Sequence, residues 1–167
     1  RDAGHIGYWW SFMPVKKDPE PFPSEGFVIK TRGDASVDLT KPEAYFYAKY
    51  AIAAGADKLT LRARNFNSSS PTYFGLVAIT EDMTVTPVIP TFTPGEGVEN
   101  YLGEAVNGQL FKFINEDGGQ GNPEKYATFE YDLSAFDGKN VVLALGVIKG
   151  EASENEDKLC IYSITLN

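Results

Sequence analysis

Aromatic rings and side-chain amides are the groups in this sequence whose chemistry points to a ligand. The chain has nine Tyr, eleven Phe and two Trp. Flat aromatic faces stack on sugar rings, and a few amides or acids reach the sugar hydroxyls. These residue types favour a carbohydrate-binding site. The candidate ligand-binding residues are Trp9, Tyr73, Tyr101, Asn65, Asn100 and Asn107.

The adjacent tryptophans, Trp9 and Trp10, have different predicted roles. Neighbouring residues on a strand point to opposite faces of the sheet. Trp10 falls on a continuous apolar stripe, which predicts a place in the core. Trp9 lies between Gly7 and Ser11 on its own face. It is therefore either covered by a neighbouring loop, such as 19–23, or open to a ligand.

Two acidic loops have the composition of a calcium site. Calcium takes several oxygen ligands from carboxylates and carbonyls in a flexible loop. Residues 115–122 and 151–157 supply such oxygens, although neither loop has the spacing of an EF-hand. Solvated turns are the alternative interpretation of both. We take Asp157 as the first candidate ligand for a structural Ca²⁺.

Catalysis has little support in the sequence. The chain has one histidine, His5, and one cysteine, Cys160. A Ser-His-Asp set would depend on a histidine next to the chain start, where residues are poorly held. Arg62 and Arg64 could serve a lyase together with a tyrosine, but no spacing fixes that geometry. The prediction is a protein that is not an enzyme.

The charge of the chain argues against two classes of partner, nucleic acids and anionic membranes. The net charge is −8, and lysine and arginine form no cluster. A phosphate-binding stripe is therefore missing, which argues against nucleic acid and against anionic lipid. The longest apolar runs fall short of the ~18 residues that a membrane span needs, so we expect no membrane insertion.

Short alternating apolar runs separated by turn residues predict an all-β fold, a two-sheet antiparallel β-sandwich formed by a single domain over 1–167. Residues 43–54 could also open a helix after Pro42, but the crowded aromatics favour a strand. Three connections are long enough to be binding loops: 93–108, 116–125 and 149–158. The expected strands are 6–12, 26–31, 44–52, 58–66, 73–80, 85–92, 109–115, 126–133, 141–148 and 159–166.

Alternation also predicts which side chains face the core. Leu59 and Leu61 share the inward face of their strand, and residues 141–148 are apolar on both faces, as in a central strand. In the last strand, alternation groups Cys160 with Tyr162, Ile164 and Leu166. Cys160 is then a small buried hydrophobic residue and not a nucleophile.

The segment 129–145 carries a resemblance to a known family. It reads FEYDLSAFDGKNVVLAL: a strand, a DLS-aromatic-x-GK turn and a second strand. This is similar to the end of galactose-binding-like jelly-roll modules, and LTLRAR at 59–64 followed by YFGLVA at 73–78 resembles their middle. In the turn, Leu133 and Phe136 are apolar anchors, Gly138 relieves the backbone, and Asp132 can accept backbone hydrogen bonds.

The resemblance implies a jelly roll over residues 44–166 and raises the expectation of structural calcium. It also implies a non-catalytic carbohydrate-binding module of a bacterial extracellular or cell-surface protein, part of a larger multidomain chain, with a polysaccharide or glycan as partner. The last strand departs from the family because its segment CIYSI, residues 160–164, has no acid. Two alternatives stay open: a structural or protein-interaction module without a sugar site, and a β-sandwich polysaccharide lyase or hydrolase.

Overall fold

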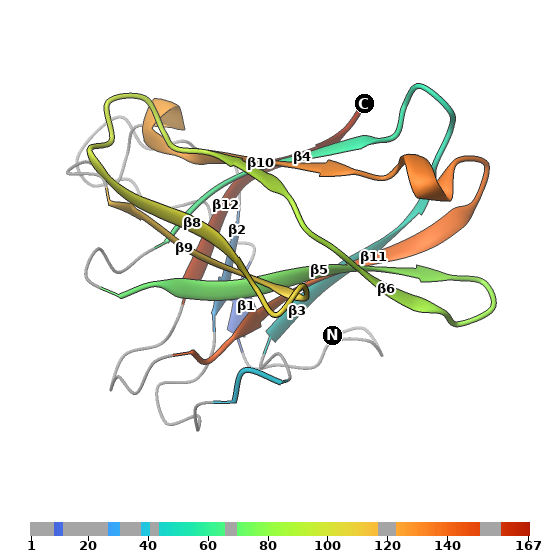
Figure 1. Cartoon of the computed structure of the whole chain (residues 1–167), viewed down its shortest axis with the longest axis horizontal. Helices are drawn as coiled ribbons and strands as arrows, with labels where there is room; N and C mark the ends of the chain where they lie inside the picture. Colours follow the sequence, from blue (N-terminus) through green and yellow to red (C-terminus); the bar gives the residue numbers. More distant parts are fainter. Residues whose placement is uncertain are drawn as a thin grey trace.

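The fold is seen in a computed structural model, which describes residues 9–11, 27–30, 38–40, 44–65, 70–116, 123–150 and 158–167. The strands of these segments form two antiparallel sheets that face each other (Figure 1). No α-helix occurs in the described segments, and none of them supplies a helix that could cross a membrane. The predicted all-β, two-sheet antiparallel sandwich is confirmed.

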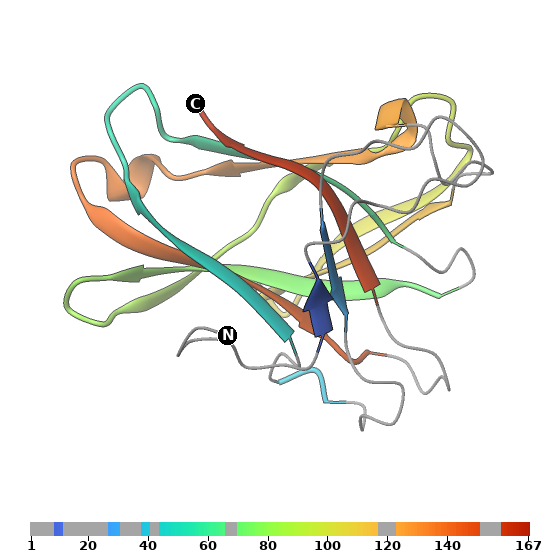
Figure 2. The ribbon, with the colours of Figure 1, turned by 180° about the vertical axis from the view of Figure 1, so that it is seen from behind.

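Sheet A contains six strands, with the last strand of the chain near its middle (Figure 2). In spatial order they are β1 (Trp9–Ser11), β2 (Phe27–Lys30), β12 (Lys158–Leu166), β4 (Lys58–Asn65), β10 (Ala127–Asp132) and β7 (Thr91–Thr93).

Sheet B has β8 at one edge and β3 at the other, and β6 pairs with the second half of β5. In spatial order the strands are β3 (Ala44–Ala51), β11 (Asn140–Ile148), β5 (Thr72–Thr80), β9 (Leu110–Glu116) and β8 (Asn100–Val106), with β6 (Val85–Val88) beside β5. Two short 3₁₀ helices, η1 (Pro123–Lys125) and η2 (Ser134–Phe136), flank β10.

The strand order is that of a jelly roll. Strand β2 pairs with β12, β3 with β11, β4 with β10 and β5 with β9, all antiparallel. The chain is therefore a long double ribbon, folded over so that successive pairs alternate between the two sheets. The pairing of early strands with late strands, such as β2 with β12, covers strand edges that would otherwise be free.

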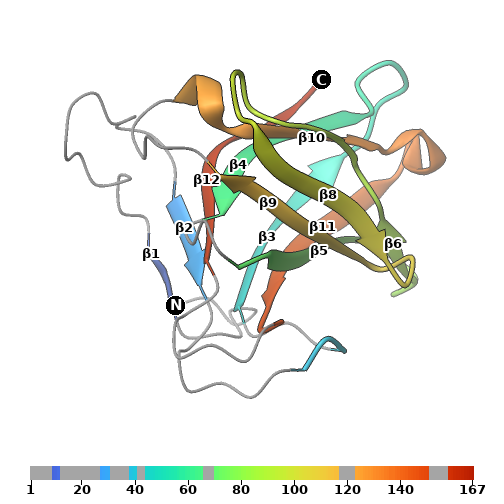
Figure 3. The same ribbon diagram turned by 60° about the vertical axis from the view of Figure 1, so that its left-hand side comes forward.

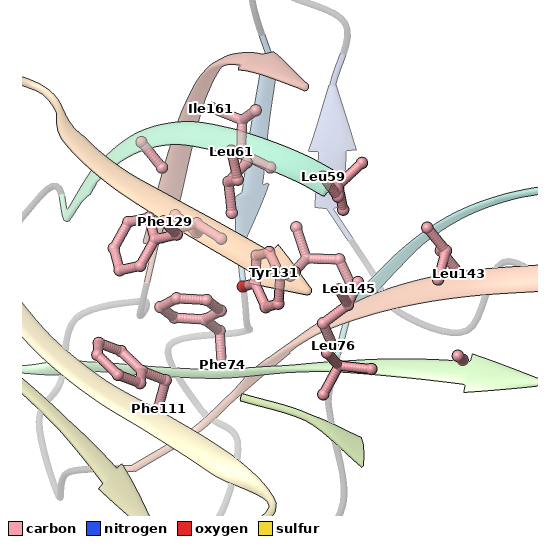
Figure 4. Close-up of a cluster of buried hydrophobic side chains, with 14 of the residues drawn as sticks. Leu59, Leu61, Phe74, Leu76, Phe111, Phe129, Tyr131, Leu143, Leu145 and Ile161 are labelled. Atoms are coloured by element: carbon pink, nitrogen blue, oxygen red, sulfur yellow. The ribbon is translucent and has the colours of Figure 1, made fainter. Parts of the chain in front are cut away.

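The core lies between the sheets and is rich in aromatic side chains (Figure 4). Phe74 of β5 makes edge-to-face contacts with Phe113 and Phe129, with ring centroids 5.4 Å and 5.1 Å apart. Leu59 and Leu61 of β4 face this core, as predicted. Strand β11 lies between β3 and β5, which confirms the central strand expected from its apolar pattern.

Two local predictions are also confirmed. Residues 44–51 form a strand and not a helix. In the turn after β10, Leu133 is fully buried, Gly138 has a φ of +74°, and Oδ1 of Asp132 accepts a hydrogen bond from the Ser134 N–H at 2.9 Å. Cys160 is buried, as predicted.

The predicted faces of the last strand are wrong. Leu159 and Ile161 point into the core, but so do Ile164 and Leu166. The register shifts between Ile161 and Ser163, where β12 has a β-bulge against β4. A bulge inserts one residue, so the alternation changes phase within the strand. Cys160 therefore shares the outer face of sheet A with its partner Arg64 and does not belong to the core side.

The segment 93–108, predicted to be a long loop, contains strand β8. This strand pairs with β9 along its whole length, and the hairpin is clearly visible in Figure 3. Its turn is Asn107–Gly108, with φ values of +54° and +64°, and the Gln109 N–H donates to the Val106 carbonyl. Positive φ at both turn residues is typical of a type I′ hairpin. The expected strand 85–92 is divided, because the chain crosses from β6 in sheet B to β7 in sheet A.

Candidate functional site

The outer face of sheet B carries a groove of about 290 Å³. Its floor is formed by β5 and β11, where Gly75 lies directly opposite Gly146 and Val77 lies opposite Ala144. Residues before and after these positions, such as Leu76 and Leu145, point into the core. Two strands that both carry small side chains on their outer face leave a hollow there. The other lining residues are Leu39, Thr40, Val85, Pro87, Gln109, Leu110 and Ile148.

Gly75 marks the point where the partners of β5 diverge. Strand β9 pairs with β5 up to Phe74, and β6 pairs with it from Leu76 onwards. The tip of the β8–β9 hairpin then comes close to the floor. A Cβ atom at Gly75 would lie 3.0 Å from the Gln109 carbonyl oxygen and 3.3 Å from Leu110 Cδ2. A glycine in a strand interior commonly marks such a close approach.

The opposite wall comes from the short segment 38–40. It is tied to the end of β11 by a hydrogen bond of 3.1 Å from the Asp38 N–H to the Lys149 carbonyl. Asp38 Oδ1 also accepts hydrogen bonds from the Thr40 N–H and hydroxyl, at 2.9 Å and 2.5 Å. Leu39 is 36 % exposed and lines the groove. These contacts hold one apolar and one hydroxyl-bearing side chain at the rim.

An aromatic side chain stands beside the groove. Tyr47 of β3 is opposite Ala144 in the sheet, so it lies on the same outer face. Its side chain is 39 % exposed, and it is one of two substantially exposed aromatic residues in the described part of the chain. The lining contains no charged side chain, although the chain as a whole is strongly acidic. The groove therefore offers an apolar floor, one aromatic neighbour, an amide and a hydroxyl.

Three of the predicted ligand-binding residues gather elsewhere, at one end of the sandwich. Asn100 and Tyr101 are opposite Glu116 and Asn115 in the β8–β9 pair, and Asn65 Oδ1 accepts a hydrogen bond of 2.9 Å from the Asn115 N–H. Tyr101 is 52 % exposed, and its ring centroid is 6.3 Å from that of Phe92. Asn100 is exposed as well.

The side-chain amides of Asn65 and its neighbour Asn115 are hydrogen-bonded to backbone groups. Both side chains are buried, at 3 % and 1 % exposure. Asn115 Oδ1 accepts from the Gly95 N–H at 2.9 Å, and its amide donates to the Lys125 carbonyl at 2.5 Å. The Asn65 amide donates to the Ser70 carbonyl at 3.4 Å. These two amides hold three connections together at this end of the sandwich. Their hydrogen bonds also satisfy polar groups that are buried away from water.

Two further candidates, Tyr73 and Asn107, lie away from the end of the sandwich that holds Asn100 and Tyr101. Tyr73 is part of β5 and only 7 % exposed, on the same outer face as the groove, where its ring packs against Gly150 and Lys112 Nζ lies 5.7 Å from its centre. Its cross-strand partner, Ile148, lines the groove. Asn107 occupies the hairpin turn at the far end of β8 from Asn100. The structure thus does not bring the six candidates to one place.

The remaining predictions concern residues beyond the described side chains. In the backbone, Trp9 is opposite Lys30 and Trp10 is opposite Ile29 in the β1–β2 pair. The rings of both tryptophans lie outside the described side chains, and Asp157 lies outside the described residues altogether. Within the described segments, no group of three His, Cys, Asp or Glu side chains could hold a metal ion. Calcium at Asp157 stays a prediction.

Each of the two arginines considered for a lyase lies beside a tyrosine: the Arg62 guanidinium carbon is 5.3 Å from the centre of the half-buried Tyr162 ring, and Arg64 contacts Tyr126. Arg64 Nε donates to the Tyr126 hydroxyl at 3.3 Å, and the guanidinium carbon is 5.8 Å from the centre of that ring. Arg64 is 3 % exposed and Tyr126 is 1 % exposed. Neither Arg64 nor Tyr126 is open to a polymer in this arrangement, and their contact stabilises the outer side of sheet A; whether the chain is an enzyme stays a prediction.

Sequence reasoning did not identify the groove or Tyr47. Tyr47 fell within a predicted strand, where its face was not assigned. Gly146 is the one break in the apolar run 141–148, and Gly75 is likewise an isolated glycine in a strand. Such glycines are signals of close approach or of a hollow surface, but their alignment depends on the register of two distant strands. A search against protein-family models and a search of curated proteins both find no match to this chain.

Proposed function

We propose that this chain is a non-catalytic carbohydrate-binding module and that the groove on the outer face of sheet B is its ligand site. The supporting observation is a hollow of about 290 Å³ with an apolar floor of small residues and the partly exposed Tyr47 beside it. Binding sites for small ligands are concave and mostly apolar, with a few polar groups that fix orientation.

The chemistry of the groove suits an uncharged glycan. The apolar C–H face of a sugar ring can lie on Val77 and Ala144 and against the Tyr47 ring. Gln109 and Thr40 line the groove, and their side chains offer hydrogen bonds to sugar hydroxyl groups. The Thr40 hydroxyl would act as an acceptor, because it donates its proton to Asp38 Oδ1. Since the lining has no basic side chain, sugars with carboxylate or sulfate groups would gain no ion pair. The proposed context is a larger extracellular or cell-surface protein that acts on or attaches to polysaccharide.

The test is a glycan array combined with affinity electrophoresis on neutral and acidic polysaccharides. Ala144→Phe fills the groove and should abolish retention. Ala51→Phe is the matched control. Ala51 of β3 lies on the same outer face of sheet B as Ala144 but outside the groove, so this variant should bind like the wild type. Absence of retention on every polysaccharide would refute the proposal.

A second pair of variants locates the site. Tyr47→Ala should weaken glycan binding by roughly tenfold, as expected for loss of an aromatic contact. Tyr101→Ala removes the other exposed aromatic ring and should leave the affinity unchanged. The reverse result would move the site to the end of the sandwich, where Tyr101, Phe92 and Asn100 lie.

One observation favours the second candidate function, a protein-interaction module. Strand β8 is a long edge of sheet B, and all seven of its residues are exposed or half-exposed. Exposed strand edges are templates for pairing with another chain. Glycan binding and strand pairing use different surfaces, so the two functions are separable by mutation.

A further inference from the structure

The tip of the β8–β9 hairpin carries a chemically reactive pair, Asn107 followed by Gly108. Of all the asparagines in the sequence, only Asn107 precedes a glycine. Both residues of the pair are exposed. Neither the Asn107 carboxamide nor the Gly108 N–H has a hydrogen-bond partner among the residues that the structure describes. The amide group and the peptide nitrogen next to it are therefore both open to water.

An asparagine in this setting can lose its side-chain amide without an enzyme. Once the Gly108 N–H has given up its proton, the nitrogen attacks Cγ of Asn107 and an N–Cγ bond forms. The Cγ–Nδ2 bond then breaks, and ammonia leaves with a proton from water. The product is a five-membered succinimide ring. Water opens this ring at either carbonyl and yields aspartate or isoaspartate, so the net reaction consumes one water and releases one ammonia.

The ring closes when the peptide unit between Asn107 and Gly108 rotates towards the asparagine side chain. Glycine permits this rotation because it has no Cβ. The space around it is open as well, since no described atom beyond its chain neighbours lies within 4 Å of the position that a Cβ of Gly108 would take. The hydrogen bond that closes the turn, from the Gln109 N–H to the Val106 carbonyl at 3.2 Å, involves neither reacting atom.

The other asparagines of the described strands lack this combination. Asn65 and Asn115 are buried, and their amides donate to backbone carbonyls. The Asn140 amide donates to Glu81 Oε1 at 3.2 Å. Asn100 is exposed, but its pairing with β9 fixes its backbone within β8. Ordered strands open less readily than exposed turns, so these four amides are protected in the folded protein.

We propose that Asn107 is a site of spontaneous deamidation in the folded protein, with water as the only co-reactant. The reaction replaces a neutral amide by a carboxylate at the hairpin tip. The next two residues, Gln109 and Leu110, line the groove of sheet B, whose lining contains no charged side chain. Deamidation thus brings a negative charge to the border of a neutral groove, whatever ligand the groove takes. The isoaspartyl product also lengthens the main chain of the turn by one carbon atom.

The first test is peptide mapping by mass spectrometry of the wild-type protein, kept folded at mildly alkaline pH and checked by near-UV circular dichroism. Asn107 should lose its amide before Asn100 and Asn140 do, and ion exchange should separate a form whose net charge is one unit below −8. The rate should rise in proportion to the hydroxide concentration, because the Gly108 nitrogen reacts only after it loses its proton. The modified peptide should contain isoaspartate as well as aspartate.

Retention of the Asn107 amide, or earlier loss of the Asn100 amide, would overturn the proposal. Aspartate without isoaspartate would also contradict it, because direct hydrolysis does not pass through the ring. This map of the wild-type protein decides the proposal even if a variant fails to fold.

Three variants test the ring closure. Asn107→Gln moves the carboxamide one carbon away from the Gly108 nitrogen and should abolish the charge-shifted form. Gly108→Ala places a methyl group beside the attacking nitrogen and should slow the reaction. Asn100→Gln is the matched control at the other end of β8 and should leave the rate unchanged. A charge-shifted form that arises in Asn107→Gln at the wild-type rate would place the reaction elsewhere and refute the assignment.

Discussion

The outer faces of the two sheets are built on the same plan but are filled differently. In sheet A, Cys160 of β12 lies opposite Arg64 of β4, and both side chains are almost completely buried. In sheet B, Gly146 of β11 lies opposite Gly75 of β5, and the surface there is hollow. A jelly roll supplies two outer faces. The side chains at the paired central positions decide which of them is filled and which can receive a ligand.

The largest expected effect is on the filled face. Arg64→Ala removes the hydrogen bond to Tyr126 and a long packed side chain, and should lower the free energy of unfolding by about 2–3 kcal/mol. Urea denaturation measures this change. Arg62→Ala is the control, because Arg62 lies on the same face but is only half-buried, and it should cost less than about 1 kcal/mol. Equal losses of stability for the two variants would mean that the buried Arg64 contributes no more than the half-buried Arg62, and would contradict a stabilising role for the filled face of sheet A.

The third variant lies in the core between the sheets, so its effect on stability does not depend on either outer face. Tyr131 is fully buried, and its hydroxyl has no hydrogen-bond partner among the residues that the structure describes. Burial raises the pKa of this phenol well above its ordinary value, which favours the neutral form. Tyr131→Phe removes an unpaired polar atom and should stabilise the protein by about 1 kcal/mol, as measured by thermal or urea denaturation. A loss of stability would show that the hydroxyl has a partner, such as a buried water.

A smaller effect is expected on the hollow face. Tyr47→Ala should change the free energy of unfolding by no more than about 0.5 kcal/mol, because the ring is partly exposed and stands beside a groove. The same variant should weaken glycan binding, so stability and affinity separate at this residue. A stability loss as large as that of Arg64→Ala would contradict the contrast between the two faces.

The smallest effect concerns pH, and here the two sheets should behave alike. Hydrogen bonds from Ser134 lower the pKa of Asp132 at the end of β10, and hydrogen bonds from Thr80 and Thr84 lower that of Asp82 after β5. A carboxyl whose pKa is lower in the folded state stabilises the protein above the unfolded value of about 3.9, and this contribution is lost as the pH falls through the folded pKa. Asp132→Asn and Asp82→Asn should each make the loss of stability below about pH 4 less steep in acid titrations. An unchanged acid limb in both variants would speak against these hydrogen bonds.

The sequence was sufficient for features that repeat along one strand. Alternation identified the inward face of β4 and the central position of β11, and the turn after β10 followed from Asp132, Leu133 and Gly138. The bulge in β12 was not predictable, because one inserted residue leaves the apolar composition unchanged while it reverses the faces beyond it. Strand β8 was missed although Asn107–Gly108 is a strong hairpin signal.

The candidate site was less accessible to sequence reasoning. Aromatic and amide residues were selected by type, but type does not distinguish a buried Tyr73 from an exposed Tyr101. The groove depends on Gly75 and Gly146 being in register across two strands that are far apart in the chain. Register is set by the pairing of whole strands, so no local pattern contains it.

The double ribbon has a consequence for how the chain reaches its folded state. The β8–β9 hairpin closes with a three-residue connection, 107–109, whereas the pairing of β2 with β12 joins segments near opposite ends of the described chain. Closing a longer loop costs more entropy, and non-local pairing slows folding. We expect the ribbon to form from the hairpin outwards, through β5–β9, β4–β10 and β3–β11, with β2–β12 last. Strand β8, whose outer edge pairs with no described strand in the native fold, would then be among the first to be ordered, and its edge would be exposed throughout the slow assembly of the rest.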